Sequence, residues 1–195
     1  MILLLEIIGT IAFAVSGAQV AFKKEMDILG VIVLGVTTAT GGGILRDLFL
    51  GITPPAAFTD PIYIVLSAAV SLIVFIPPVR KKLGKIDGAL LVADAIELGI
   101  FTAIGTVTGM SHGGRFLAIF VGVLTGVGGG TIRDVFASEM PSIFVRHFYA
   151  CASIIGAAVC VIIAPLNVNI AVFISAAVVF VLRILAAKYR WNLPK

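Results

Sequence analysis

The sequence predicts an all-α membrane protein with seven transmembrane helices, on three observations: its composition, the length of its apolar runs and an internal repeat. Hydrophobic residues make up 60% of the 195-residue chain, charged residues only 12%, and the mean hydropathy is +1.18. Soluble domains carry about 25% charged residues, and disordered chains combine low hydrophobicity with many charges, so both classes are excluded. At about 20 residues per span, the chain accommodates seven helices in a single membrane domain, residues 1–195.

Each predicted helix is an apolar run interrupted by few charges. The first run could be mistaken for a cleaved signal peptide, but it has no basic start and it contains Glu6, so we interpret it as a retained helix. The predicted spans are Ile2–Phe22, Ile28–Leu50, Pro61–Val79, Gly88–Thr108, Arg115–Phe136, Ile143–Ala164 and Val168–Ala187. Cys151 and Cys160 both fall in the sixth run, nine residues apart, and so point to opposite faces of one helix and cannot bridge within it.

The basic residues predict the orientation of the chain in the cell membrane. Arg115 is the one basic residue at the span ends on one side, and the other side collects Lys23, Lys24, Arg80, Lys81, Lys82, Lys85, Arg146, Lys188, Arg190 and Lys195. Because lysine and arginine accumulate on the cytoplasmic side, we expect a cytoplasmic C-terminus and an outside N-terminus. We expect Arg183 and the Lys188–Lys195 tail to form a solvated basic end, with bound anionic lipid as the alternative. The modest net charge of +4 needs no nucleic-acid partner.

A 15-residue segment occurs twice in the chain. Residues 35–49 recur as residues 122–136, 87 positions later, and both copies contain Gly-Gly-Gly-x-x-Arg-Asp-x-Phe. The repeat extends to Glu6, which matches Asp94 one residue out of register. Residues 1–86 form the first repeat, 87–166 the second, and 167–195 a seventh helix outside it. Because each repeat has three helices, the second enters the membrane from the opposite side, which is an inverted-topology repeat.

Each repeat carries three consecutive glycines in its second helix. These are Gly41, Gly42 and Gly43 in helix two, and Gly128, Gly129 and Gly130 in helix five. Each glycine weakens a helix by about 1 kcal/mol relative to alanine, so we expect both helices to be broken there, with carbonyls free to coordinate a cation in an ion path. The alternative is that the glycines let helices two and five pack closely.

Charged residues follow both glycine triplets at membrane depth, where an unpaired charge costs about 2.5–3.5 kcal/mol. Neighbouring helix residues point about 100° apart, so we expect pairs between the repeats, Arg46 with Asp134 and Arg133 with Asp47. The alternative is that the arginine heads cap carbonyls freed at the glycine breaks. These pairs could act as a gate or simply join the two halves. Further candidates are the acids Glu6, Asp94 and Glu97, the ion-path hydroxyls Thr38 and Thr125, and the constriction residues Phe49 and Phe136.

The sequence contains no motif for ATP binding and no common zinc motif. Walker A, HExxH and paired-cysteine zinc patterns are all missing from it. We therefore expect neither an enzyme nor an ATP-driven pump, and no metal or other cofactor.

The doubled Gly-Gly-Gly-x-x-Arg-Asp motif, the three-plus-three repeat and the additional helix resemble the prokaryotic trimeric intracellular cation (TRIC) channels. The resemblance covers the whole chain, and the residues that match are the two triplets with Arg46, Asp47, Arg133 and Asp134. It implies a homotrimer that conducts potassium and sodium, with an ion path in each protomer bounded by helices two and five kinked at the glycines. Animal members have a basic phosphoinositide motif beside the second helix; here Lys23 and Lys24 lie in the first loop instead.

Three functional hypotheses follow. The first is a monovalent cation channel. The second is a secondary transporter of a small solute such as glycine, since a bacterial branch with the same repeated unit carries that name; Arg46 and Arg133 would then hold the carboxylate. The third is a non-conducting membrane scaffold, in which the arginine and aspartate residues could be replaced jointly by apolar residues without loss of any flux.

Overall fold

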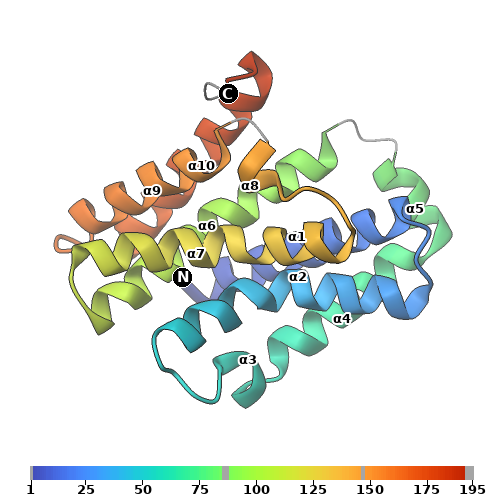
Figure 1. Ribbon diagram of the computed structural model, residues 1–195, viewed down its shortest axis with the longest axis horizontal. Helices are drawn as coiled ribbons and strands as arrows, with labels where there is room; N and C mark the ends of the chain where they lie inside the picture. The colour runs from blue at the N-terminus through green and yellow to red at the C-terminus, as the bar shows by residue number, and fades with distance from the viewer. Residues whose placement is uncertain (1, 85–87, 146–147, 192–195) are drawn as a thin grey trace.

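The computed structural model describes residues 2–84, 88–145 and 148–191, and the regular secondary structure within these ranges is helical (Figure 1). The helices are α1 (Ile2–Lys23), α2 (Ile28–Phe49), α3 (Ala56–Thr59), α4 (Ile62–Phe75), α5 (Pro77–Gly84), α6 (Ala89–His112), α7 (Arg115–Phe136), α8 (Ser142–Val145), α9 (Tyr149–Ile163) and α10 (Val168–Tyr189). Of the basic residues used above to predict orientation, Lys85, Arg146 and Lys195 lie outside the described residues.

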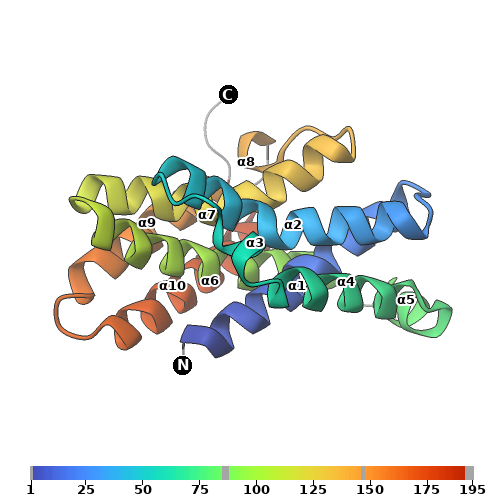
Figure 2. The same cartoon turned by 90° about the horizontal axis from the view of Figure 1, so that it is seen from below.

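The same order of helices occurs twice along the chain. Two long helices, a one-turn helix and a helix of 14 or 15 residues make up α1–α4 and again α6–α9. The first set gathers on one side of the molecule and the second on the other, with α10 against α6 and α9 (Figures 1 and 2). The two sets meet where α2 packs on α7 and α1 packs on α6.

Within the described residues, five helices are long and apolar enough to cross a membrane by themselves: α1, α2, α6, α7 and α10. The predicted third span, Pro61–Val79, is shorter than expected, because α4 ends at Phe75 and α5 leaves it at an angle of 87°. Pro77 and Pro78 explain this bend, since proline has no backbone N–H to continue the helical ladder. α9, in the predicted sixth span, is an apolar helix of 15 residues.

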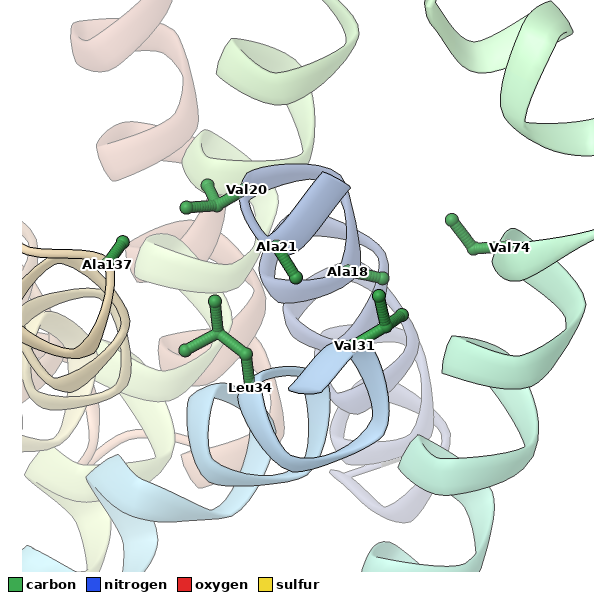
Figure 3. Close-up of a cluster of buried hydrophobic side chains, with 7 residues drawn as sticks. All are labelled: Ala18, Val20, Ala21, Val31, Leu34, Val74 and Ala137. Carbon is green, nitrogen blue, oxygen red and sulfur yellow. The ribbon is translucent and has the colours of Figure 1, made fainter. Parts of the chain in front are cut away.

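Small side chains let the helices of the first half approach closely. Ala18, Ala21 and Val31 are fully buried where α1 crosses α2, and Val74 of α4 adds to the same cluster (Figure 3). Large apolar side chains lie instead on the outer faces, for example Phe116 and Ile162, which are 85% and 73% exposed. This arrangement suits a lipid environment, in which the outer face of a helix bundle is as apolar as its interior.

Candidate functional site

The two glycine triplets lie at the crossing of α2 and α7. A Cβ atom added to Gly42 would collide with the backbone carbonyl of Thr125, and one added to Gly129 would collide with the carbonyl of Thr38. A Cβ on Gly128 would lie 3.1 Å from the Cα of Gly42. The two backbones therefore touch where no side chain fits between them, which is the close packing that small residues allow in membranes.

The expected interruption of helices two and five is not present in the structure. α2 is helical from Ile28 to Phe49 and α7 from Arg115 to Phe136, straight through both triplets. The expectation rested on the intrinsic cost of glycine in a helix. Tertiary contact outweighs that cost here, because only glycine permits the crossing and the crossing in turn holds each backbone in place.

A pocket whose lining includes charged side chains lies beside this crossing in the first half. Its volume is about 120 Å³. Glu6 of α1 accepts a hydrogen bond from the Tyr63 hydroxyl of α4 at 2.8 Å, and Arg46 Nε donates to Asp47 Oδ1 at 2.8 Å. The complete lining is Glu6, Thr10, Ala39, Thr40, Gly43, Arg46, Asp47, Ala56, Ala57, Tyr63 and Phe101. The pocket thus brings two acids, a guanidinium and a phenol together among apolar helices.

The second half contains the equivalent residues, but they form a closed cluster. Asp94 takes the place of Glu6, and it accepts from the Tyr149 hydroxyl at 3.1 Å as Glu6 does from Tyr63. Arg133 lies 3.4 Å from Asp94, 3.6 Å from Glu97 and 2.8 Å from Asp134. Each of these four charged side chains is at least 93% buried.

Contacts from outside the second repeat complete this cluster. Arg133 Nη1 also donates to Ser16 Oγ of α1, so α7 is held to the first half. Arg183 of α10 lies 3.3 Å from Asp94 Oδ2, and its guanidinium stacks 4.4 Å from the centre of the Tyr149 ring. Arg183 was expected at a solvated basic end, but it is 2% exposed and faces the interior.

The arginine–aspartate pairs form within each repeat and not between repeats. Arg46 pairs with Asp47, and Arg133 with Asp134, so the predicted Arg46–Asp134 and Arg133–Asp47 pairs are wrong. The long arginine side chain curls back to its neighbour, although the two Cβ atoms point apart. Each aspartate is held by a second contact, because Asp47 Oδ2 accepts from Ala56 N at 2.8 Å and Asp134 Oδ2 from Ser142 N at 2.7 Å.

Comparison with known proteins identifies the family to which this chain belongs. The model of a family described as glycine transporter matches residues 3–77 and 91–165, which is more than half of the chain. A solved structure of a TRIC cation channel is 41% identical in sequence, with a TM-score of 0.90 over 98% of this chain and 95% of that chain. The chain belongs to the TRIC family.

Two further comparisons agree with this assignment. The structure of the trimeric intracellular cation channel orthologue from Rhodobacter sphaeroides is 34% identical, with a TM-score of 0.87 over 97% of this chain and 98% of that chain. The UPF0126 inner membrane protein YadS of Escherichia coli strain K12 is 42% identical over 153 residues, 78% of this chain and 73% of its own length. The protein is accordingly a multi-pass membrane protein.

The predicted hydroxyl and aromatic candidates of this TRIC-family chain lie outside the pocket. Thr38 and Thr125 are fully buried, and each donates its hydroxyl hydrogen to a carbonyl one turn earlier, that of Leu34 or Val121. Phe49 and Phe136 are 55% and 56% exposed at the ends of α2 and α7. In this structure the two threonines are packed between helices, and the two phenylalanines face outward.

Sequence reasoning missed both tyrosines and the role of Arg183. Tyr63 and Tyr149 follow the repeated motif by nearly the same distance, so an extension of the repeat alignment into the third helix finds them. Arg183 belongs to the helix outside the repeat and has no counterpart in the first half. A lone arginine in an apolar run was the one available signal, since such a residue needs a buried partner.

Proposed function

We propose that the protein is a cation channel of the cell membrane that conducts monovalent cations, potassium and sodium, through a path in each protomer of a homotrimer. The observation that carries this proposal is the pocket beside the α2–α7 crossing, where the carboxyl groups of Glu6 and Asp47 lie among apolar helices. Acidic groups that line a cavity at membrane depth typically mark an ion pathway. The family supports the same function, since a similar solved protein is a TRIC cation channel and another is a trimeric one.

The proposed path runs from the pocket along α2 to the crossing with α7. Gly43 lines the pocket, whereas Gly42 and Gly129 close the adjacent crossing. A bend of either helix at its triplet separates the two backbones and widens the passage. The glycines thus let α2 and α7 pack tightly when the path is closed, and they also make each helix easy to bend. We further propose seven membrane crossings, with α4 and α9 as the two short ones, an outside N-terminus and a cytoplasmic C-terminus.

Planar-bilayer recording of the purified protein between unequal potassium chloride solutions tests the proposal. We expect discrete unitary currents that reverse near the potassium equilibrium potential. Currents that reverse near the chloride potential, or bilayers that stay silent while the same preparation is folded and trimeric, would overturn it. Substituting sodium for potassium in the same recordings measures the preference between the two ions.

A pocket-filling substitution tests where the path lies. Thr40 lines the pocket, so Thr40→Leu places an apolar side chain in it, and we expect the unitary conductance to fall several-fold. Thr37→Leu is the matched control, because Thr37 lies on the same helix outside the pocket lining and also donates to a carbonyl four residues earlier. Equal conductance in the two variants would place the path elsewhere.

A small-solute transporter is the second candidate, and the same pocket is the observation that favours it. Arg46 and Glu6 both line a cavity of about 120 Å³, so a carboxylate and an ammonium group of one small amino acid could each find a charged partner. The family model that matches the chain is described as glycine transporter. Saturable uptake of labelled glycine into vesicles, together with silent bilayers, is the result that favours this candidate over the channel.

A further inference from the structure

Each half of the protein contains a carboxylate that accepts a hydrogen bond from a tyrosine, but the two pairs differ in whether an arginine lies against them. In the second half, Tyr149 donates to one oxygen of Asp94, and Arg183 of α10 donates to the other at 3.3 Å. The Arg183 guanidinium also lies over the Tyr149 ring, 4.4 Å from its centre. A cation thus lies where a carboxylate and an aromatic face meet, a combination that binds cations well when water is excluded.

In the first half the corresponding cation is missing from the described part of the chain. Tyr63 donates to Glu6 Oε2 at 2.8 Å, and this hydroxyl is the one polar partner of the Glu6 carboxylate among residues 2–84, 88–145 and 148–191. Arg46 lines the same pocket, but its Nε is engaged with Asp47 and it forms no ion pair with Glu6 in this part of the chain. Among the described residues the first repeat is followed by no counterpart of α10, because α5, the helix after α4, is short and bent away from it.

We propose that Glu6 and Tyr63 form a binding site for a compact organic cation of the guanidinium or ammonium type, whose place in the second half is taken by Arg183. The carboxylate of Glu6 accepts hydrogen bonds from the cation, and the Tyr63 ring offers its face, as Asp94 and Tyr149 do for Arg183. At about 30 Å³ per water molecule, the pocket of about 120 Å³ has room for about four waters or one ion of that size. This site is an equilibrium binding site, so it exists whether or not the protein conducts.

Titration calorimetry of the full chain in detergent, with methylguanidinium chloride as the probe, tests the proposal directly. We expect saturable binding with a Kd on the order of 1 mM. Glu6→Gln is expected to weaken it at least about tenfold, because the charge-assisted hydrogen bonds are lost. Glu139→Gln is the matched control: it makes the same change at an exposed acid that pairs with Lys24 at the surface. Absence of binding, or equal affinity in the two variants, overturns the proposal.

Two tyrosine variants separate the ring from the hydroxyl. Tyr63→Phe keeps the aromatic face and removes the hydrogen bond to Glu6, so we expect the probe to bind within about threefold of the wild type. Tyr63→Leu removes the face and is expected to weaken binding by about threefold to tenfold. Equal binding by Tyr63→Leu and Tyr63→Phe would show that the ring plays no part and would overturn the site as drawn.

The second half provides an independent check of the same chemistry. Arg183→Ala removes the internal cation, and we expect it to lower the melting temperature of the purified protein and to raise the stoichiometry of probe binding from one to two per chain. Methylguanidinium should restore part of the lost melting temperature in this variant, with sodium chloride at equal concentration as the control. If the probe stabilises Arg183→Ala no more than it stabilises the wild type, methylguanidinium does not replace the Arg183 guanidinium, and the proposed similarity of the two sites is wrong.

Discussion

Replacing Gly42 by alanine is expected to destabilise the protein by about 2–3 kcal/mol, whereas Gly43→Ala is expected to be neutral or to stabilise it by up to about 1 kcal/mol. The two residues are adjacent in the same helix and undergo the same chemical change. A Cβ at Gly42 meets the Thr125 backbone carbonyl of α7 in a clash, but a Cβ at Gly43 has one neighbour, Arg46 Nη2, at 3.9 Å. The difference therefore measures the contact between the helices and not the helix propensity of glycine.

Chemical unfolding in mixed detergent micelles, followed by circular dichroism, measures this pair of variants. Because the clash at Gly42 is with backbone, no side-chain rotation relieves it, and α2 and α7 must move apart. Gly129→Ala, which meets the Thr38 carbonyl from the opposite side, is expected to behave like Gly42→Ala. Equal stability of Gly42→Ala and Gly43→Ala would show that the two helices are not in backbone contact. Recording unitary currents from Gly43→Ala adds a functional readout, since its methyl group enters the pocket.

Hydropathy and the repeated motif were sufficient to predict the five long apolar helices and the recurrence of the same helix order in two halves. They were not sufficient to predict the course of the third span. Hydropathy stays high across Pro77, so it gives no sign that the chain turns there by 87°. The glycine triplets were assigned to breaks for a related reason. Local propensity disfavours glycine in a helix, and the compensating contact with Thr125 or Thr38 comes from a helix far along the chain.

The candidate charges were found from sequence, but their partners were not. All seven acidic and basic candidates lie in the pocket or in the closed cluster, and they are Glu6, Arg46, Asp47, Asp94, Glu97, Arg133 and Asp134. Each arginine side chain is long enough to reach the aspartate next to it, and that aspartate also accepts a hydrogen bond from a backbone N–H at the start of α3 or α8. A prediction based only on helix faces takes neither contact into account. Nor does the motif itself distinguish an open half from a closed one, since both halves contain the same Arg-Asp pair.

That difference between the halves predicts unequal effects for the same arginine substitution. Arg133→Met is expected to destabilise the protein by about 3–5 kcal/mol, because it leaves Asp94, Glu97 and Asp134 buried with one fewer positive charge. Arg46→Met is expected to cost about 1–2 kcal/mol. Arg46 has a single carboxylate partner, and its side chain is 14% exposed and lines the pocket, whereas the Arg133 side chain is 2% exposed.

Unfolding of the two methionine variants in the same micelles checks this prediction, and a double variant identifies the cause. Glu97 has no hydrogen-bond donor within the described ranges and faces Arg133 at 3.6 Å, so it is the carboxylate that depends most on this charge. Combining Arg133→Met with Glu97→Met removes the guanidinium together with the buried acid that faces it, and we expect it to be more stable than Arg133→Met alone by about 1–2 kcal/mol. Additive losses, or equal costs for Arg46→Met and Arg133→Met, would mean that the closed cluster does not depend on charge balance.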